Sequence, residues 1–393
     1  MNIALWLAVA LIGGTVHTGD GPPIAGATVL MENGRVVAVG PNITIPKDAQ
    51  RIDVTGKVLT PGFIDGWTSL GLVEIWGVAG SNDSGGGAGP IRARERASDS
   101  FNPDSSLIPI QRAHGVTTVM SVPHGGVLSG QPGIWDLGTF PVVVPSAGLV
   151  GVLAGQREGS RGSRFATIRA VFSDALIFHK NRTRFLSNRF RPLAASRLDL
   201  EAVLPIAHGK RPFFLKVDRR SDIRNALDWA QSVGVRLVLV GAAEAWLEAD
   251  AIARAKVGVI LNPTSNAPTS FDRLRARSDA AAILNRAGVE IAISTFSTHN
   301  VRKLRQWGGN AVRAGLPHEA AINAVTSGPA RLLGLSRRGH IAPDSVANLV
   351  VWSGDPFEFS SAVERVYIRG HVQKKSHRQR ALFQRYRVTP SAP

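Results

Sequence analysis

Continuously apolar runs that alternate with amphipathic stretches are the feature of this sequence that most limits its fold. The runs lie at residues 115–126, 141–153, 211–218, 234–246, 256–265 and 288–300. Strands of a parallel sheet are buried on both faces and therefore read as apolar runs, and crossover helices join them. Segments such as "SDIRNALDWAQSV" supply the amphipathic pattern between the runs. With "KVLTPGFIDGW" as the first strand, the pattern predicts an α/β fold, a (β/α)8 TIM barrel over residues 61–338.

Both ends of the chain have a different texture, with short alternating runs separated by turn residues. Residues 11–60 contain Asn33-Gly34 between two such runs, which is a strong signal for a β-hairpin. Residues 339–372 have the same character. Each piece is too small to be stable alone, so we expect the two to combine into one small composite β-sandwich.

The positive charge is concentrated in two places. The chain of 393 residues carries a net charge of +17, with 17 Lys and Arg against 7 Asp and Glu in residues 151–236, and 8 against 0 in residues 365–393. Residues 373–393 form a basic tail that could contact anions or nucleic acid, or could simply be a solvated, frayed terminus. We expect residues 154–210 to be the least regular part of the barrel, with a helix in "RFATIRAVFSDALIFHKNRTRFL".

The first ten residues are apolar, and two interpretations stay open. Residues 1–10 could be a shortened export signal or an apolar extension of the first strand, so a periplasmic or secreted location and a cytoplasmic one are both allowed. The run is too short to cross a bilayer. The chain has no cysteine, which excludes disulfides and thiolate-bound metals. The Gly-rich segments 81–89 and 124–133 read as mobile loops.

Two motifs carry a resemblance to a known family. "GKVLTPGFIDG" resembles the first barrel strand of the metal-dependent amidohydrolase superfamily, and "SGPARLLGLSRRGHIAPDSVANLVVWSGDPFE" resembles its return to the sandwich. The opening "IGGTVHTGDGPPIAGATVLMENGRVVAVG" fits the N-terminal sandwich strands of the same family. The chain looks most like the imidazolonepropionase-related members. The resemblance implies a hydrolase of non-peptide carbon–nitrogen bonds, whose metal ion, commonly zinc, activates a water molecule.

The expected metal ligands are missing. The family's first strand ends in Asp-x-His-x-His, where this chain keeps Asp65 but has Trp67 and Ser69. Two later histidine positions hold Lys216 and Glu244, and Phe296 stands where the family has an aspartate base. Neither an indole nor an ammonium group binds a cation as a ligand. We therefore expect no metal ligand set and no cofactor, although a divalent metal is the norm in the family.

The same strand ends supply our candidate site. The candidate catalytic residues are Lys216, Glu244, Asp65 and His124, and the candidate substrate-binding residues are Trp67, Ser69, Asp218, Asn262, Phe296 and His299. Lys216 and Glu244 could form an ion pair that merely fills the old metal position, or Lys216 could be a base or nucleophile of lowered pKa.

Two histidines could take part in catalysis. His124 and His299 could act as a general base, as a ligand of an altered metal site with Asp65, Asp218 and Glu244, or as hydrogen-bonded loop residues. The remaining histidines are expected away from the barrel mouth: His17, His114, His179, His208, His318, His340, His371 and His377.

Three functions remain open from the sequence. The chain could be a hydrolase of a small, cyclic or open-chain amide with an altered or metal-free site. It could be a catalytically silent relative that binds a small molecule or a partner, or a basic protein that associates with anions or nucleic acid. A homo-oligomer is compatible with each of the three.

Overall fold

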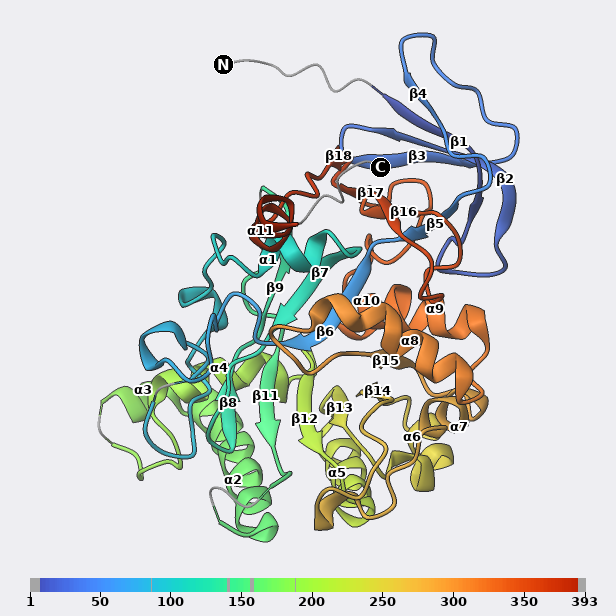
Figure 1. The fold of residues 1–393 in the computed structure, drawn as a ribbon. Helices are drawn as coiled ribbons and strands as arrows, with labels where there is room; N and C mark the ends of the chain where they lie inside the picture. Colours follow the sequence, from blue (N-terminus) through green and yellow to red (C-terminus); the bar gives the residue numbers. More distant parts are fainter. Residues whose placement is uncertain (1–7, 86, 140–141, 156–158, 188, 388–393) are drawn as a thin grey trace.

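The computed structural model describes residues 8–85, 87–139, 142–155, 159–187 and 189–387, and Figure 1 shows the arrangement of the elements. Strands β1 to β6 span Val9–Val16, Ile24–Glu32, Arg35–Gly40, Gln50–Asp53, Val58–Pro61 and Phe63–Thr68. Strands β7 to β12 span Val116–Ser121, Leu128–Gly130, Gly133–Asp136, Val142–Val144, Leu149–Val152 and Phe213–Val217. Strands β13 to β18 span Leu237–Gly241, Gly258–Leu261, Ile291–Ile293, Leu349–Trp352, Val363–Ile368 and His371–Val372.

The helices follow most strands of the central part. Helices α1 to α6 span Ile108–Arg112, Arg161–Lys180, Arg182–Leu186, Arg197–Ala207, Arg220–Val233 and Ala249–Arg254. Helices α7 to α11 span Ala280–Arg286, Leu304–Arg313, His318–Val325, Ser327–Leu332 and Arg378–Tyr386. The expected helix in the basic central segment is confirmed as α2 and α3. None of the helices in the described part is both long and apolar enough to cross a membrane.

The two ends of the chain build one eight-stranded sheet. Its strand order is β18-β17-β16-β5-β1-β2-β3, and β4 pairs with β1 outside this path. The predicted hairpin is confirmed, because β2 and β3 pair antiparallel around Asn33 and Gly34, which both have positive φ. The C-terminal strand β16 pairs antiparallel with β5, so segments about 290 residues apart in the sequence meet in this sheet. The described strands form one continuous sheet here, and the sandwich of two layers stays a prediction.

The central strands form two further sheets. One has the order β10-β9-β7-β6, and the other has the order β15-β14-β13-β12-β11-β8. The predicted parallel pairing is observed between β6 and β7, and along the series β11, β12, β13, β14 and β15. The mixed α/β fold is therefore confirmed. Among the described residues the ladders do not join into a closed barrel. β7 pairs antiparallel with β9 and β11 pairs antiparallel with β8, so β7 and β11 belong to different sheets.

A shared apolar interior nevertheless joins the two central sheets. One buried cluster contains Ile64 of β6, Met120 of β7, Val150 of β11, Phe214 of β12 and Val240 of β13. Ile260 of β14 and Ala292 of β15 belong to the same cluster, and residues of α10 contribute to it. Side chains on the other face of the strands pack against the helices in a second, larger cluster. Strands β6, β7 and β11 to β15 are thus buried on both faces, which explains why they read as continuous apolar runs.

One glycine marks the crossing from the terminal sheet to the central strands. Gly62 lies between β5 and β6, and a Cβ atom placed on it would stand 2.1 Å from Oγ1 of Thr117. Thr117 belongs to β7, so the chain passes too close to this neighbour for any side chain. A glycine is therefore required where one strand leaves the first sheet and the next begins.

Two local expectations differ from the structure. Residues 124–133, expected to be a mobile loop, contain the buried strand β8, because Ser129 and Leu128 face the interior beside β11. The basic tail is not frayed over its described part: α11 is a helix capped by the side chain of His377, which accepts a hydrogen bond from the backbone N–H of Arg380.

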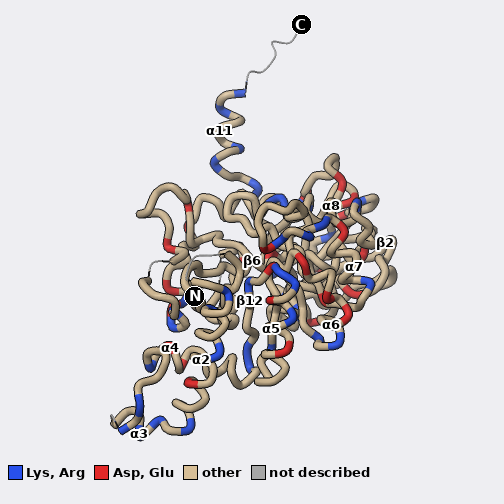
Figure 2. The backbone as a smooth tube through the Cα atoms, turned by 90° about the horizontal axis from the view of Figure 1, so that it is seen from below, with Lys and Arg blue, Asp and Glu red and all other residues tan. Residues whose placement is uncertain are grey.

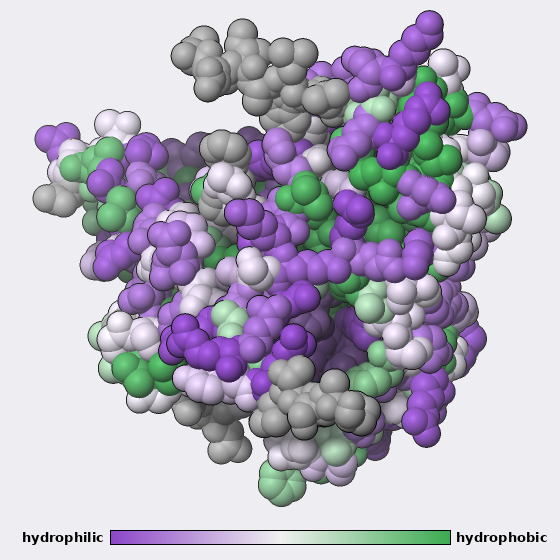
Figure 3. Space-filling view, turned by 45° about the horizontal axis from the view of Figure 1, so that its top comes forward, coloured by the Kyte–Doolittle hydropathy of each residue, from purple (hydrophilic) through white to green (hydrophobic). Residues whose placement is uncertain are grey.

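Helix α11 is exposed to solvent along its whole length. It buries none of its residues and projects away from the body of the molecule, as Figure 2 shows. Hydrophobic residues gather on the surface near the terminal sheet in Figure 3, where Ile12, Ala38, Ile43 and Ile45 are only partly buried around a small cluster. Residues 1–7 of the apolar N-terminal segment lie outside the described part, and Val9 and Ala10 belong to β1.

Candidate functional site

The candidate residues all lie at or just after the carboxyl ends of parallel strands. This is the edge of an α/β sheet where the loops meet and where barrel enzymes carry their active sites. Asp65, Trp67 and Ser69 lie at the end of β6, His124 follows β7, Lys216 and Asp218 lie at the end of β12, Glu244 follows β13, Asn262 follows β14, and Phe296 and His299 follow β15.

Asp65 is completely buried and links β6 to β15. Its Oδ2 accepts a hydrogen bond of 2.5 Å from the hydroxyl of Thr295, and its Oδ1 accepts a short one from the hydroxyl of Ser294. The backbone N–H groups of Trp67 and Thr295 also donate to this carboxyl group. No ladder joins β6 to β15 in the described residues, so this side-chain link connects the first and last central strands.

Burial controls the protonation of Asp65. Desolvation raises its pKa from 3.8 to about 6, and hydrogen bonds from Ser294 and Thr295 oppose this rise. Since both oxygens already accept hydrogen bonds from neighbouring hydroxyl and N–H groups, the carboxyl group is fully engaged within the protein.

Ser69 and His124 form a close polar pair at the ends of β6 and β7. Oγ of Ser69 lies 2.6 Å from Nε2 of His124, and Ser69 is only 3% exposed. The pair forms because β6 and β7 are parallel neighbours whose ends are in register at Thr68 and Ser121. The backbone N–H of His124 donates to the carbonyl of Ser84, which fixes the loop that carries the imidazole.

The imidazole of His124 is held in its neutral form. Burial and the nearby positive charge of Lys216 lower the pKa of His124 from 6.5 to about 4. The ring of Trp76 lies 5.9 Å from the imidazole, centroid to centroid, and Trp76 itself is half-exposed. A neutral imidazole in contact with a hydroxyl can accept its proton.

The positive charge of Lys216 acts on His124 of this pair. Burial lowers the pKa of Lys216, Asp218 acts in the opposite direction, and Arg273 lowers it further. Among the residues that the structure describes, no carboxylate oxygen lies within ion-pair distance of the Lys216 ammonium. Lys216 lines a cavity of about 180 Å³ together with Asn262, Phe296, Arg273 and Arg277.

The sequence suggested an ion pair between Lys216 and Glu244, and the structure does not bring these two side chains together. The carboxylate of Glu244 is buried and accepts hydrogen bonds from the backbone N–H groups of Arg220 at 2.9 Å and Arg275 at 3.1 Å. Glu244 therefore anchors two loops in the described structure. Asp218 is also engaged, because its Oδ2 accepts a 2.8 Å hydrogen bond from Arg273.

The remaining candidates shape or anchor the strand ends. Trp67 is buried in the interior cluster, and its ring centroid lies 6.2 Å from that of Phe296. Phe296 has a φ of +53°, a left-handed conformation that is strained for a bulky side chain. Asn262 accepts hydrogen bonds from Thr264, and Nε2 of His299 lies 2.7 Å from the carbonyl oxygen of Glu74. His299 thus ties the 74–82 loop to the loop after β15.

The strand ends do not offer a set of ligands for a dication. No three His, Asp or Glu side chains of the described strand ends place their ligand atoms within 4.8 Å of one another. Asp65 is saturated by hydrogen bonds, aromatic rings occupy the space around Trp67, and Lys216 would repel a cation.

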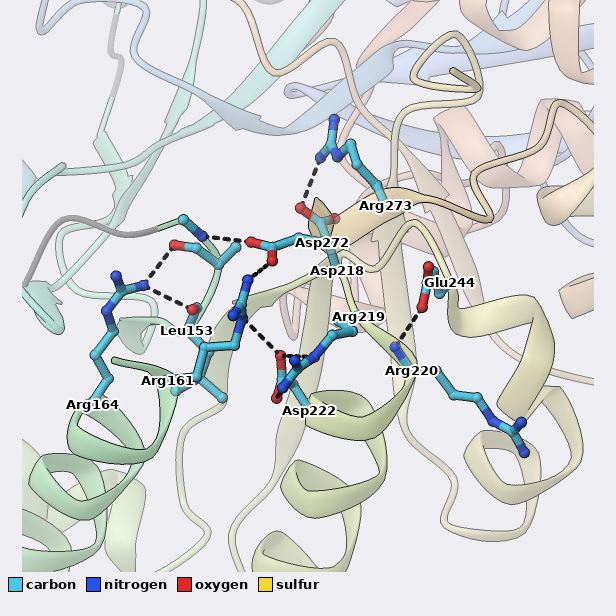
Figure 4. Close-up of polar contacts among 12 residues, drawn as sticks. Leu153, Arg161, Arg164, Asp218, Arg219, Arg220, Asp222, Glu244, Asp272 and Arg273 are labelled. Carbon is cyan, nitrogen blue, oxygen red and sulfur yellow. Dashed lines mark hydrogen bonds and ion pairs between the residues drawn. The ribbon is translucent and has the colours of Figure 1, made fainter. Parts of the chain in front are cut away.

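An arginine–carboxylate network, which the sequence did not predict, surrounds the ends of β11 and β12 (Figure 4). Arg161 at the start of α2 forms an ion pair with Asp272, and its Nε lies 3.3 Å from Oδ2 of Asp222. Arg219 also donates to Asp222, at 2.7 Å. The excess of arginine in residues 151–236 was the available signal. The partners of Arg161 could not be read from it, because Asp222 lies 61 positions further on at the start of α5 and Asp272 lies 111 positions further on.

Comparison with known proteins identifies relatives. A family described as "Amidohydrolase family" matches residues 272–373. A solved amidohydrolase from Thermotoga maritima MSB8 is 30% identical, with a TM-score of 0.83, over 93% of this chain and 99% of that one. An adenosine deaminase from Xanthomonas campestris with bound zinc shares the fold, with a TM-score of 0.57 at 18% identity over 93% of this chain and 92% of that one.

A third similarity is local. A dihydroorotase from Mycobacterium tuberculosis is 42% identical over 60 residues, which are 15% of this chain and 13% of that enzyme. The aligned part thus spans about an eighth of this curated relative. The extended match to the Thermotoga protein, together with the parallel strands and the C-terminal return to the sheet, shows that the chain belongs to the amidohydrolase superfamily.

Proposed function

We propose that the chain is a hydrolase of carbon–nitrogen bonds other than peptide bonds, with a metal-free site built on Ser69, His124 and Lys216. The observation that carries this proposal is the 2.6 Å contact between the Ser69 hydroxyl and Nε2 of a neutral His124. A serine next to an unprotonated imidazole is an activated nucleophile. Membership of a superfamily of hydrolases agrees with the reaction class.

The proposed reaction has two halves. Oγ of Ser69 bonds to the carbonyl carbon of the amide while its proton passes to Nε2 of His124. The C–N bond then breaks as His124 returns this proton to the leaving nitrogen. Water next attacks the acyl ester, giving a proton to His124, which passes it to Oγ as Ser69 is released.

Lys216 has an electrostatic role in this proposal. Its ammonium group is close enough to lower the pKa of His124, and no carboxylate oxygen of the described residues lies within ion-pair distance of it. A buried positive charge beside the nucleophile would stabilise the negative charge that develops on the carbonyl oxygen. Asp65 and Glu244, which the sequence suggested as catalytic, are given anchoring roles instead, because their oxygens are occupied.

The lining of the cavity beside Lys216 suggests the kind of substrate. The cavity of about 180 Å³ is lined by Lys216, Arg273 and Arg277, together with Asn262 and Phe296. Its small size and positive charge favour a small amide, cyclic or open-chain, that also carries a carboxylate.

The scaffold of this site is proposed to be a (β/α)8 barrel over residues 61–338. A β-sandwich from residues 11–60 and 339–372 would cover it, followed by the tail 373–393. The parallel pairing of β11 to β15 and the single interior cluster support this division, as does the pairing of β16 with β5.

The proposal is tested with the full chain after dialysis against a chelator. Small carboxylated amides and cyclic imides are incubated with it, and products are followed by mass spectrometry. We expect turnover without metal and a loss of about 100-fold or more in Ser69→Ala and in His124→Gln. His208→Gln, at an exposed histidine, is the matched control and should keep full activity.

Two results would contradict the proposal. If turnover depends on added metal, the reaction uses a metal ion as in the rest of the family. If Ser69→Ala keeps full activity, Ser69 is not the nucleophile. A fluorophosphonate probe gives a second measurement, because it should label Ser69 in the wild type and not in His124→Gln.

A second candidate function has its own supporting observation. Trp67 and Phe296 fill the space near the saturated Asp65, as expected of a silent relative that binds a small molecule. A cavity of about 620 Å³ lined by Lys216, Asp218, Phe271 and Arg273 could hold such a ligand. Saturable binding of a carboxylated amide with no product and no Ser69 labelling would favour this function over the hydrolase.

A further inference from the structure

Two histidines and a glutamate meet at the boundary between the terminal sheet and helix α9. His17 follows β1 directly, and His318 and Glu319 are the first two residues of α9. Nδ1 of His17 lies 3.0 Å from Oε2 of Glu319, and Nδ1 of His318 lies 3.4 Å from Oε1 of the same carboxylate. One carboxylate thus stands between two imidazoles that are about 300 residues apart in the sequence.

The spacing of these three groups fits a metal ion. One ligand atom from each residue can be chosen so that all lie within 4.8 Å of one another. Within the described residues, this is the one group of three or more His, Asp or Glu with that property. Two nitrogens and one carboxylate oxygen are a common ligand set for zinc and related dications.

A second carboxylate orients one of the imidazoles. Nε2 of His318 lies 2.8 Å from Oδ2 of Asp355, and Oδ1 of Asp355 accepts a hydrogen bond from the backbone N–H of Phe357. With Nε2 donating to Asp355, the lone pair of Nδ1 points toward Glu319. Histidines that bind metals almost always donate their other N–H to such a carboxylate.

The surroundings leave room for a further ligand. His17 is buried, with 9% of its side chain exposed, and its backbone N–H donates to the carbonyl of Leu59. His318 and Glu319 keep 34% and 38% of their side chains exposed. The group is therefore fixed on the sheet side and open to water on the helix side, which suits three protein ligands and a water molecule.

We infer that His17, His318 and Glu319 form a binding site for a divalent cation of the zinc type, with Asp355 orienting His318. The ion would tie β1 to α9 and so clamp the terminal sheet onto the central domain. The site lies outside the cluster of Ser69, His124 and Lys216, and it is independent of the proposed hydrolase chemistry.

A nearby pair offers a matched control. Nδ1 of His340 lies 2.7 Å from Oδ2 of Asp20, also at the edge of the terminal sheet. This pair has a histidine and a carboxylate but lies in no group of three possible ligands among the described residues. His340→Asn should therefore change zinc binding little, while His318→Asn should abolish it.

The experiment measures Zn²⁺ binding to the full chain by isothermal titration calorimetry after removal of metals with a chelator. We expect one Zn²⁺ per chain in the wild type and in His340→Asn, and none in Glu319→Gln or His318→Asn. Asp355→Asn should weaken binding by about 10–100-fold. Zinc at about 100 times Kd should raise the Tm by roughly 3 °C, and Glu319→Gln should lose this shift.

Three further measurements test the site without substitution, check the folding of the variants and distinguish this site from the proposed hydrolase site. Co²⁺ in place of Zn²⁺ should give d–d absorption bands and paramagnetically shifted ring signals of His17 and His318, which tests the site without any substitution. The Tm of each variant without metal shows whether it is folded. Lys216→Met should bind Zn²⁺ normally, which separates this site from the proposed hydrolase site. No stoichiometric binding, or equal binding in Glu319→Gln, would overturn the inference.

Discussion

The hydroxyl oxygen of Ser69 lies 2.6 Å from Nε2 of His124, although the two residues are 55 positions apart. Ser69 occupies the second histidine position of the first-strand signature, and His124 comes from the loop after the neighbouring strand. Parallel pairing of β6 with β7 is what places them side by side. A position that looks like a lost ligand in the sequence is thus half of a serine–histidine pair in the fold.

The acid limb of the pH–rate profile should report His124. The imidazole accepts a proton only when neutral, so kcat/KM should rise with pH through about 4, the pKa of His124, and then stay level toward neutrality. Lys216→Met removes the charge that opposes protonation, so the limb should move to higher pH while the rate falls. Lys210→Met, at an exposed lysine, should leave the profile unchanged. If the acid limb stays in place in Lys216→Met, the charge of Lys216 does not lower the pKa of His124.

His124 should also affect stability in a pH-dependent way. Its folded pKa is about 4 and its ordinary value is 6.5, so between these values the unfolded chain binds the extra proton. Stability from the neutral imidazole is therefore present above pH 6.5 and is lost as pH falls toward 4, by about 3 kcal/mol in total. Denaturant unfolding at several pH values should show this loss in the wild type and a smaller one in His124→Gln. An identical pH dependence in both proteins would contradict the assignment.

The titration of Asp65 should change the stability with pH in the opposite direction. Its folded pKa of about 6 exceeds 3.8, so the folded state holds the proton more tightly and stability falls as pH rises through this window. Asp65→Ala removes this slope, but it also leaves the hydroxyls of Ser294 and Thr295 without their acceptor, at a cost of about 3 kcal/mol. Asp48→Ala, at an exposed turn, is the control and should change stability by less than about 0.5 kcal/mol. Chemical denaturation measures both effects.

Arg161 should be needed for stability at the ends of β11 and β12. Its guanidinium group contacts both Asp222 and Asp272, whose side chains are about 10% exposed. Arg161→Met would leave one nearly buried charge without its ion pair, so we expect a loss of about 2 kcal/mol in the free energy of unfolding. Arg182→Met breaks the more exposed pair with Glu201 and should cost less than about 1 kcal/mol. Equal losses in the two variants would argue against a special role of Arg161.

Much of the fold could be predicted from local patterns. The runs around Val116, Phe213, Leu237, Gly258 and Ile291 became strands, because burial on both faces leaves a continuous apolar signature. Asn33-Gly34 formed its hairpin, since both residues adopt positive φ readily. Strand β8 was mistaken for a loop, because a three-residue strand flanked by glycines carries almost no periodic signal.

The site could be located from the sequence but its partners could not. The signature around Asp65 indicated which strand ends meet, whereas the ion pair suggested between Lys216 and Glu244 did not form, because the carboxylate of Glu244 turns to two backbone N–H groups. His17 and His318 were expected away from the barrel mouth, and nothing in the sequence indicated that these two rings lie next to one another.

The sequence by itself determined the superfamily and most of the alternation of strands and helices, and it indicated which strand ends form the candidate site. These depend on residue types and short spacings, which a linear chain displays directly. Only the tertiary structure decided that Ser69 meets His124, that Asp65 links β6 to β15, and that Glu319 stands between two histidines. Each of these contacts joins residues that are 55 or more positions apart, or depends on which way one side chain turns, and both are set by how the strands and helices pack.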